Sequence, residues 1–313
     1  MNDRTGRNIT YLRLSVTERC DLRCRYCMPA DAICREDGLS DEEIVLAARA
    51  AASLGIRKLR VTGGEPLVRR GIVELCHALA QIPGIEELCI TTNGLALPEL
   101  AVPLREAGVQ RVNMSLDTLD PAKYRSITRV GSLERALRGL DAALSAGFEK
   151  LKINVVLIGG VNDDEIPALA ALTQLYPLDV RFIELMPMVD GGFGKEAYLP
   201  ASAVLDALPE AVPMEPDGGV ARLYRLPGAW GNIGLISPLS AHICSSCDRI
   251  RLTSDGKLKP CLHSPSELSI KGLGYEEMVR QFERAILEKP GWHGELSATA
   301  RSRAGRSMNQ IGG

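Results

Sequence analysis

The chain has 313 residues, 45% of them hydrophobic, and a net charge of −2 at pH 7. This length and apolar content suit one large domain, or a domain with an extension. The near balance of charge excludes a general affinity for nucleic acid, so any anion site must be local. The start, Met1-Asn2-Asp3-Arg4, lacks the apolar region of a secretion signal, and no apolar run approaches the ~18 residues of a membrane span. We therefore expect a cytoplasmic protein that does not associate with membranes.

Strand-like and helix-like segments alternate through the first 185 residues. Strands are predicted over residues 9–17, 57–62, 87–92, 110–116, 150–158 and 179–185. Helices are predicted over residues 41–54, 71–82, 98–107, 120–127, 133–146 and 164–176. Such alternation with short connections is typical of a parallel sheet, and repeated right-handed crossovers favour a curved one. The predicted fold is α/β, a partial (β/α)6 TIM-like barrel, although the pattern alone does not decide whether the barrel closes.

The pattern changes near residue 190, where Pro and Gly become frequent. Short strands are expected over 220–225 and 232–236, a hairpin over 250–261, and a helix over 275–288. We predict two parts: residues 1–190 form the partial barrel, and residues 191–313 form a smaller C-terminal extension packed against it.

One face of the predicted strands carries an unusual number of cations. Residues two apart on a strand share a face, and the apolar face is the one that helices must cover. The cations on the opposite, inward face are Arg13, Lys58, Arg60 and Lys152. Each would cost several kcal/mol to bury without an anion, which favours an anionic ligand in the barrel. The alternative is that they lie at the solvated end or pair with Glu65, Asp117 and Glu184.

Six of the nine cysteines fall into two groups of three. The groups are Cys20, Cys24 and Cys27, and Cys244, Cys247 and Cys261. In a cytosolic chain, clustered cysteines are more typical of metal binding than of disulfides. We interpret the other three, Cys34, Cys76 and Cys89, as incidental, the last two as small core residues.

The first group has the spacing Cys-x-x-x-Cys-x-x-Cys, directly after the first predicted strand. A [4Fe-4S] cluster normally takes four cysteine ligands, and this motif supplies only three. One iron would then be open to another ligand, which is the mark of a reactive metal site. The alternatives are a zinc loop or three unrelated cysteines.

Polar loops follow the predicted strands at the end where a barrel's active site lies. The segment Thr62-Gly63-Gly64-Glu65-Pro66 follows the second strand. Its glycines allow the backbone to approach a ligand closely, and Glu65 can accept from an ammonium group. Polar residues at 91–94 and 115–117 follow the next two strands, so several strand ends are expected to build one site.

The second group is a Cys-x-x-Cys pair, Cys244 and Cys247, followed by Cys261. Zinc is a serious alternative to a cluster here, because His263 or His242 could complete a site of three cysteines and one histidine.

The first group, with Tyr26 inside it, and Gly63-Gly64-Glu65-Pro66 resemble the radical S-adenosylmethionine (radical SAM) enzymes. That resemblance implies a [4Fe-4S] cluster whose open iron is chelated by the amino and carboxylate groups of SAM. It also implies that the reduced cluster cleaves SAM to give a 5′-deoxyadenosyl radical.

Further motifs resemble the GTP 3′,8-cyclase family of molybdenum cofactor biosynthesis, nearly end to end. They include Arg13-Leu14-Ser15-Val16-Thr17, Cys247-Asp248-Arg249-Ile250-Arg251-Leu252 and the terminal Gly312-Gly313. The resemblance implies conversion of GTP to (8S)-3′,8-cyclo-7,8-dihydroguanosine 5′-triphosphate by hydrogen abstraction from C3′. It implies a second [4Fe-4S] cluster on Cys244, Cys247 and Cys261. It also implies an external low-potential electron donor, a downstream cyclic pyranopterin monophosphate synthase and a monomer or homodimer.

The family's functional residues map onto this chain. The implied SAM contacts are Tyr26, Gly64, Glu65, Ser115 and Met186, and the implied GTP contacts are Arg13, Arg60, Thr91, Lys152, Arg249 and Arg251. Lys58 and Arg181 are weaker candidates for the triphosphate. Arg13, Gly312 and Gly313 are expected to act in catalysis, the glycines by reaching into the active site. The segment 28–40 is shorter than the family pattern. The resemblance therefore implies the chemistry of the first cluster but not the family's lid over it.

Two other functions compete with this one, and the tail has a second interpretation. A radical SAM peptide maturase also carries auxiliary clusters in a C-terminal extension, but usually with more than three cysteines there. A non-enzymatic iron–sulfur or zinc scaffold would leave the Gly-Gly-Glu-Pro loop and the inward cations without a purpose. The final glycines could equally be a disordered end.

Overall fold

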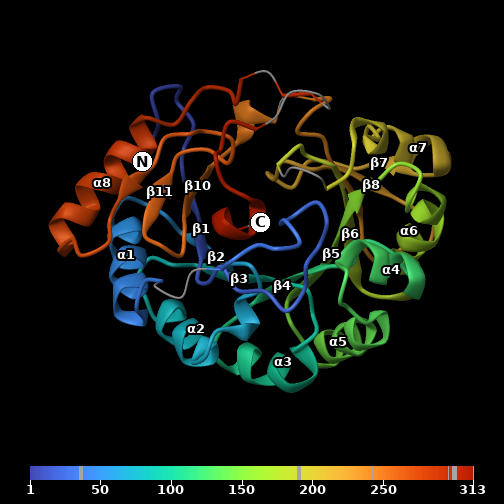
Figure 1. Ribbon diagram of the computed structural model, residues 1–313, viewed down its shortest axis with the longest axis horizontal. Coiled ribbons are helices and arrows are strands. Elements are labelled where there is room, and N and C mark those ends of the chain that lie inside the picture. The colour runs from blue at the N-terminus through green and yellow to red at the C-terminus, as the bar shows by residue number, and fades with distance from the viewer. Residues whose placement is uncertain (35–37, 189–191, 242, 295, 298–301, 313) are drawn as a thin grey trace.

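A curved parallel sheet forms the centre of the computed structural model, which describes residues 1–34, 38–188, 192–241, 243–294, 296–297 and 302–312. Its first six strands are β1 (Tyr11–Ser15), β2 (Lys58–Thr62), β3 (Glu87–Thr92), β4 (Arg111–Ser115), β5 (Lys150–Leu157) and β6 (Leu178–Glu184). They lie side by side in chain order, all parallel. The predicted α/β partial barrel is confirmed (Figure 1).

The C-terminal part extends this sheet at both edges. Its strands are β7 (Val212–Pro213), β8 (Arg222–Arg225), β9 (Ile233–Ile236), β10 (Arg249–Leu252), β11 (Lys257–Lys259) and β12 (Leu268–Ser269). β9 lies parallel to β6, and β10 lies parallel to β1. β10 and β11 form the expected antiparallel hairpin. Among the described residues the sheet runs from β12 to β7 without closing, and the domain boundary at residue 190 stays a prediction because both parts contribute strands to it.

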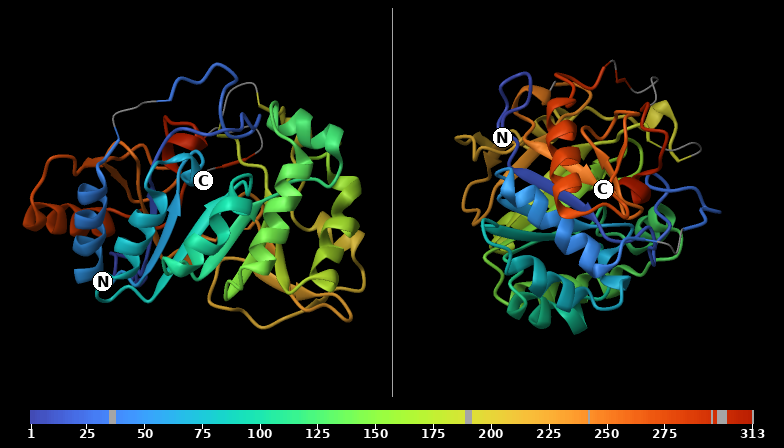
Figure 2. Two further views of the ribbon diagram at one scale, coloured as in Figure 1. Left: turned by 90° about the horizontal axis from the view of Figure 1, so that it is seen from below. Right: turned by 90° about the vertical axis from the view of Figure 1, so that its left-hand side faces the viewer.

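Helices surround the sheet on its outer side (Figure 1). They are α1 (Asp41–Ser53), α2 (Ile72–Ala80), α3 (Leu97–Glu106), α4 (Pro121–Thr128), α5 (Leu133–Ser145), α6 (Ile166–Leu175), α7 (Ala203–Ala207) and α8 (Tyr275–Leu287). The short helix α9 (Met308–Ile311) lies inside the barrel instead. Short 3-10 turns are η1 (Pro66–Val68), η2 (Asp163–Glu165), η3 (Lys195–Ala197) and η4 (Cys244–Ser246). α8 packs beside α1, so a helix of the C-terminal part lies next to the first helix of the barrel (Figure 2). The pattern had not predicted α7 or α9.

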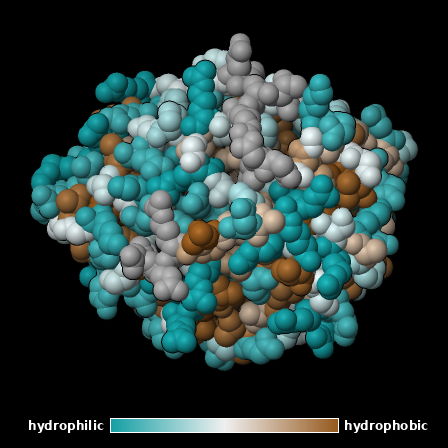
Figure 3. Space-filling model, in the orientation of Figure 1, coloured by the Kyte–Doolittle hydropathy of each residue, from teal (hydrophilic) through white to brown (hydrophobic). Residues whose placement is uncertain are grey.

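The core lies between the sheet and the helices, as alternation on the strands requires. Leu12 and Leu14 of β1 are fully buried on that side, and Arg13 and Ser15 face the lumen of the barrel. In Figure 3 the face around the lumen is largely hydrophilic, with hydrophobic residues showing in separate patches. Within the described residues, no helix is long and apolar enough to cross a membrane.

Candidate functional site

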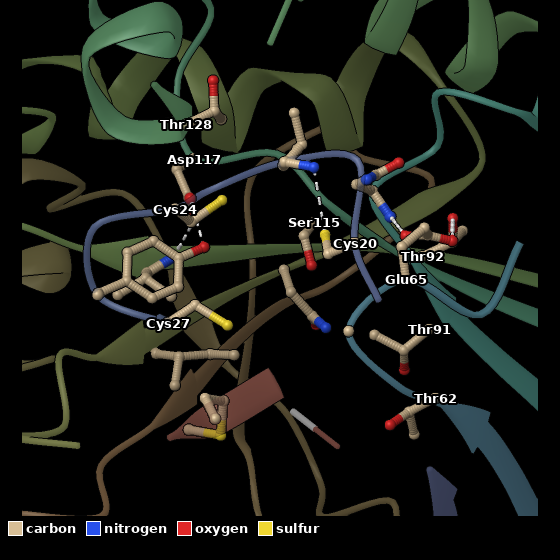
Figure 4. Close-up of a pocket in the computed structure, with 18 of the residues that line it drawn as sticks. Cys20, Cys24, Cys27, Thr62, Glu65, Thr91, Thr92, Ser115, Asp117 and Thr128 are labelled. Carbon is tan, nitrogen blue, oxygen red and sulfur yellow. Dashed lines mark hydrogen bonds between the residues drawn. The ribbon is translucent and has the colours of Figure 1, made fainter. Parts of the chain in front are cut away.

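Three cysteines line one cavity at the carboxyl end of the sheet. Cys20, Cys24 and Cys27 lie on the loop after β1, and their side chains point into this cavity (Figure 4). Burial raises the pKa of Cys24 well above its ordinary value and that of Cys27 to about 12. Buried thiols of this kind ionise only against a strong positive charge, which a metal centre supplies. Their chemistry therefore fits a metal cluster with three protein ligands.

The Gly-Gly-Glu-Pro loop packs directly on the backbone of the cysteine loop. The Gly64 amide donates to the Thr17 carbonyl (2.7 Å), and the Glu65 amide donates to that of Arg19 (2.8 Å). A Cβ on Gly64 would lie 2.4 Å from the Arg19 carbonyl oxygen. The glycine is therefore required for close approach to the chain itself, in addition to lining the cavity.

Glu65 joins two of the loops that follow strands. Its carboxylate accepts from Thr92 Oγ1 (2.7 Å), the Asn93 amide (2.7 Å) and the Leu67 amide (3.0 Å). Burial raises its pKa to about 7 despite these donors. Glu65 thus holds the loops after β2 and β3 together, next to the loop that carries the cysteines.

Tyr26 is fixed by a carboxylate from the loop after β4. Its hydroxyl donates to Asp117 Oδ2 (2.7 Å), and Asp117 Oδ1 accepts from the Val156 amide (2.8 Å). Burial raises the pKa of Asp117 to about 6. The residues expected to contact SAM all line the same cavity: Tyr26, Gly64, Glu65, Ser115 and Met186.

Three arginines stand side by side across the lumen. Arg13 on β1 is paired in register with Arg60 on β2 and with Arg251 on β10. Burial and the neighbouring arginines, Arg251 first among them, lower the pKa of Arg13 well below its usual range. Arg60 Nη1 donates to Thr91 Oγ1 (3.4 Å), while its buried Nε has no hydrogen-bond partner among the described residues. A cluster of three buried arginines fits a polyanion.

A second set of cations lies across the lumen on β5 and β6. Lys152 Nζ lies 3.2 Å from Asp179 Oδ2 and 3.9 Å from Asp217 Oδ2, and Arg181 lies 3.6 Å from Asp217. Lys58, by contrast, pairs with Glu87 at 2.7 Å. Burial, and secondly the charge of Arg181, lower the pKa of Lys152 to about 7.

The alternative pairing of these cations with Glu65, Asp117 and Glu184 is wrong. Those three carboxylates accept hydrogen bonds from other groups, and Glu184 accepts from the amides of residues 201, 239 and 240. Two carboxylates that the pattern did not single out contact the cations of β5 and β6. Asp179 lies next to Lys152, and Asp217 lies next to Arg181.

The second cysteine group lies next to β10, the strand that pairs with β1. Cys244 is the first residue of η4, Cys247 follows η4 just before β10, and Cys261 follows β11. Burial raises the pKa of Cys244. For Cys247, the charges of Lys289 and Arg249 outweigh burial and lower the pKa. Arg249 and Arg251, expected to contact GTP, begin and continue the adjoining β10.

Of the two histidines considered as a fourth zinc ligand, His263 lies within the described residues. Buried His263 contacts Ser302 Oγ through Nδ1 (2.9 Å), and burial lowers its pKa to about 3. His242 lies outside the described residues. Among the described residues, no three His, Cys, Asp or Glu side chains are arranged to share one metal ion.

The C-terminal tail enters the lumen. α9 lies in the middle of the barrel in Figure 1, with the Met308 amide donating to the Cys27 carbonyl (3.0 Å). Arg251 Nη1 donates to the Gly312 carbonyl (2.6 Å), and a Cβ on Gly312 would lie 2.4 Å from Thr62 Oγ1. Gly312 thus occupies a space without room for a side chain, at a φ of +82°. Gly313 lies outside the described residues.

An ion-pair network holds the tail in place. Arg306 contacts Glu267 (2.6 Å) and Asp255 (2.9 Å), which lie beyond β11 and in the hairpin turn. No motif pointed to this anchor, because its partners are brought together only by the folded hairpin.

Comparison with protein families gives two matches that together span most of the chain. Residues 14–173 match the radical SAM superfamily, and residues 178–294 match the family described as Molybdenum Cofactor Synthesis C. The chain is 47% identical over 321 residues to the GTP 3′,8-cyclase of Alkaliphilus oremlandii and 46% identical over 326 residues to that of Moorella thermoacetica, with both chains covered completely in each comparison. It is 44% identical over 323 residues to that of Geobacter sulfurreducens, with 99% of each chain covered.

Solved structures resemble the fold at low identity. Streptococcus suis SuiB bound to S-adenosylmethionine superposes with a TM-score of 0.63 at 17% identity, covering 84% of this chain but only 63% of SuiB. The structure of anSMEcpe with bound AdoMet gives a TM-score of 0.60 at 14% identity, covering 91% of this chain and 79% of that one. At such identities the likeness concerns the fold alone.

Proposed function

Because the chain belongs to the GTP 3′,8-cyclase family of the radical SAM superfamily, we propose that it converts GTP to (8S)-3′,8-cyclo-7,8-dihydroguanosine 5′-triphosphate. This is the first step of molybdenum cofactor biosynthesis. One arrangement supports the proposal above all: Arg13, Arg60 and Arg251 lie side by side on strands that adjoin the two sets of three cysteines, and Arg251 binds the glycine tail.

The first cysteine set and its cavity suit a [4Fe-4S] cluster and SAM. Cys20, Cys24 and Cys27 would hold the cluster, and Gly64, Ser115 and Met186 would line the SAM site. When bound, this cofactor pair supplies a 5′-deoxyadenosyl radical. The chain keeps the surrounding loops rigid through Glu65 and the Tyr26–Asp117 bond. Cys244, Cys247 and Cys261 would hold a second [4Fe-4S] cluster beside β10.

The lumen cations would orient GTP between the two sets. Arg13, Arg60 and Lys152 are placed to hold the triphosphate, with Thr91, Arg249 and Arg251 as further contacts. These buried groups have lost their hydrogen bonds to water, and charge-assisted bonds to phosphate oxygens would take the place of those bonds. Holding the substrate in one orientation is the main contribution that the protein can make to a radical reaction. An external low-potential donor would supply the electrons, and a cyclic pyranopterin monophosphate synthase would consume the product.

Transfer of deuterium from the substrate tests this function. With GTP deuterated at C3′, SAM and a strong reductant under anaerobic conditions, we expect the label in 5′-deoxyadenosine and an equimolar amount of cyclised GTP. Mass spectrometry of both products measures this. Unlabelled 5′-deoxyadenosine, formed at the same rate without GTP, would refute the proposal.

Replacing Arg13, Arg60 or Lys152 by Ala should weaken GTP binding by about tenfold to a hundredfold, since each charged contact contributes roughly 1.5–3 kcal/mol. SAM binding should be largely retained. Calorimetry with each ligand measures both affinities. Lys150 is a matched control because it lies on the same strand but is 40% exposed, and Lys150→Ala should change GTP affinity little. Unchanged affinity in all three lumen variants would show that GTP binds elsewhere.

GTP affinity should fall as pH rises through 7, because Lys152 has a pKa of about 7 in the free protein. Bound phosphate favours the ammonium form and raises this pKa, so binding takes up a proton above pH 7. The loss should approach about tenfold per pH unit. Calorimetry in buffers of different ionisation enthalpy measures the proton uptake. In Lys152→Arg the side chain stays charged, and the protonation of GTP itself affects both proteins equally. GTP affinity of this variant should therefore fall less steeply with pH than that of the intact protein. An equal slope in both proteins would assign the proton elsewhere.

A further inference from the structure

A buried lysine lies against the second cysteine set, just after α8. Lys289 is only 4% exposed. Its ammonium donates to Cys247 Sγ (3.5 Å), to the Arg249 carbonyl (2.7 Å) and to the Pro260 carbonyl (3.0 Å). A lysine has three donors, and all three are therefore directed at the two segments that carry Cys247 and Cys261.

The contacts leave the charge of Lys289 without a carboxylate partner in the part of the chain that the structure describes. A buried ammonium is costly unless an anion lies near it. The one contacting group that can become anionic is the sulfur of Cys247. Charge and geometry therefore both favour a thiolate at this position, as a metal-bound cysteine would provide.

The residues that follow Lys289 are linked to Cys244 through hydrogen bonds of Arg7. Arg7 donates to the Cys244 carbonyl (2.8 Å) and to the carbonyls of Pro290 (2.7 Å) and Gly291 (3.3 Å). Asp3 holds Arg7 at 2.6 Å, with both side chains almost fully buried. The segment 289–291 thus connects to Cys244 through Arg7, to Cys247 directly, and to Cys261 through the preceding proline.

We propose that Lys289 is a positioning residue for the second cysteine set, and that it raises the reduction potential of the cluster held there. An N–H···S bond and a nearby positive charge stabilise the reduced cluster, which carries one more negative charge than the oxidised form. This role rests on the proposed function, specifically on a [4Fe-4S] cluster at Cys244, Cys247 and Cys261. The reduction potential of that cluster would then depend on a residue outside the cysteine motifs.

Another buried lysine provides a matched control. Lys259 is fully buried, and its ammonium contacts the Ser264 carbonyl (2.8 Å) and Glu267 (3.1 Å). Its charge reaches Cys261 but is paired with Glu267, and none of its hydrogen bonds within the described residues goes to a sulfur. Lys259→Met removes a buried ammonium from the same region without touching an N–H···S bond. Comparing it with Lys289→Met separates an effect on the cluster from a general loss of stability.

The test uses the full-length chain with Cys20, Cys24 and Cys27 replaced by Ala, so that only the second cluster contributes to the spectrum. Iron and sulfide are counted, and the reduced fraction is followed by electron paramagnetic resonance at fixed potentials. For Lys289→Met we expect the ratio of reduced to oxidised cluster to fall at least about tenfold at the parent's midpoint, or ~59 mV for one electron. Lys289→Arg, which keeps the charge, should restore most of this ratio. Lys259→Met should change the ratio much less, because the charge of Lys259 is paired with Glu267.

If Lys289→Met loses its cluster while Lys259→Met keeps it, the positioning role is supported, and the potential is then measured in Lys289→Gln, which keeps a donor without the charge. Full iron content with an unchanged potential in Lys289→Met would overturn the proposal. The same change in Lys259→Met would also overturn it. Zinc instead of iron in the parent itself would overturn the second-cluster assignment, and this outcome is recognised before any lysine is replaced.

Discussion

We expect deletion of Gly312 and Gly313 to abolish formation of cyclised GTP, while fold, iron content and GTP affinity stay close to those of the intact enzyme. Two glycines bury little apolar surface, so their loss costs little stability. Gly312 nevertheless lies deep in the lumen, bound by Arg251 and close to Thr62 and Ser15. A reacting group must be held within contact distance of its target, and misplacement by about an ångström can cost on the order of a hundredfold in rate. A single-turnover assay for cyclised GTP measures the effect.

Two alanine variants distinguish this role from a disordered end. Gly312→Ala adds a methyl group 2.4 Å from Thr62 Oγ1, whereas Gly305, at a φ of +66°, has nothing within 4 Å of its Cβ position. Both substitutions strain the backbone, but only the first fills the lumen. Gly312→Ala should therefore resemble the deletion, and Gly305→Ala should keep most of the activity. Full activity of the truncated enzyme would show that the tail has no catalytic role.

Replacing any one of Cys20, Cys24 and Cys27 by Ala should abolish formation of 5′-deoxyadenosine under dithionite. Three cysteines leave one iron of a [4Fe-4S] cluster for SAM, and a cluster held by only two is not retained in that form. Liquid chromatography of the quenched reaction measures the nucleoside directly.

Cys76 supplies the control for these substitutions. It is a fully buried thiol on α2, in the core between sheet and helices. Cys76→Ala should lower stability by a small-cavity cost and leave 5′-deoxyadenosine formation near the intact level. A wild-type yield from a Cys24→Ala variant would refute the assignment of the first cysteine set.

Much of this site could be predicted because the relevant patterns are local. Alternation along β1, β2 and β5 placed Arg13, Arg60 and Lys152 on the inward face, and the parallel register then brings Arg13 and Arg60 side by side. The spacing of Cys20, Cys24 and Cys27 put all three on one loop. The SAM and GTP roles of individual residues came from family resemblance, and those roles stay predictions.

The remaining parts depend on contacts between segments far apart in the chain. Lys289 is 42 residues from Cys247, and Arg7 is 237 residues from Cys244, so no spacing rule connects them. Asp217 lies in an irregular segment, yet it faces Lys152 and Arg181 across the lumen. Its polar sequence fitted an exposed loop equally well. Only the folded sheet determines which carboxylates meet the buried cations.

We propose that GTP is held between two four-iron clusters, each on one set of three cysteines. Anaerobic analysis of iron, acid-labile sulfide and zinc in the purified full-length protein tests it most directly. We expect about eight irons and eight sulfides per chain, and no zinc. Replacing Cys244, Cys247 and Cys261 by Ala should reduce both counts to about four. About four irons together with one zinc per chain in the unmodified protein would contradict the claim.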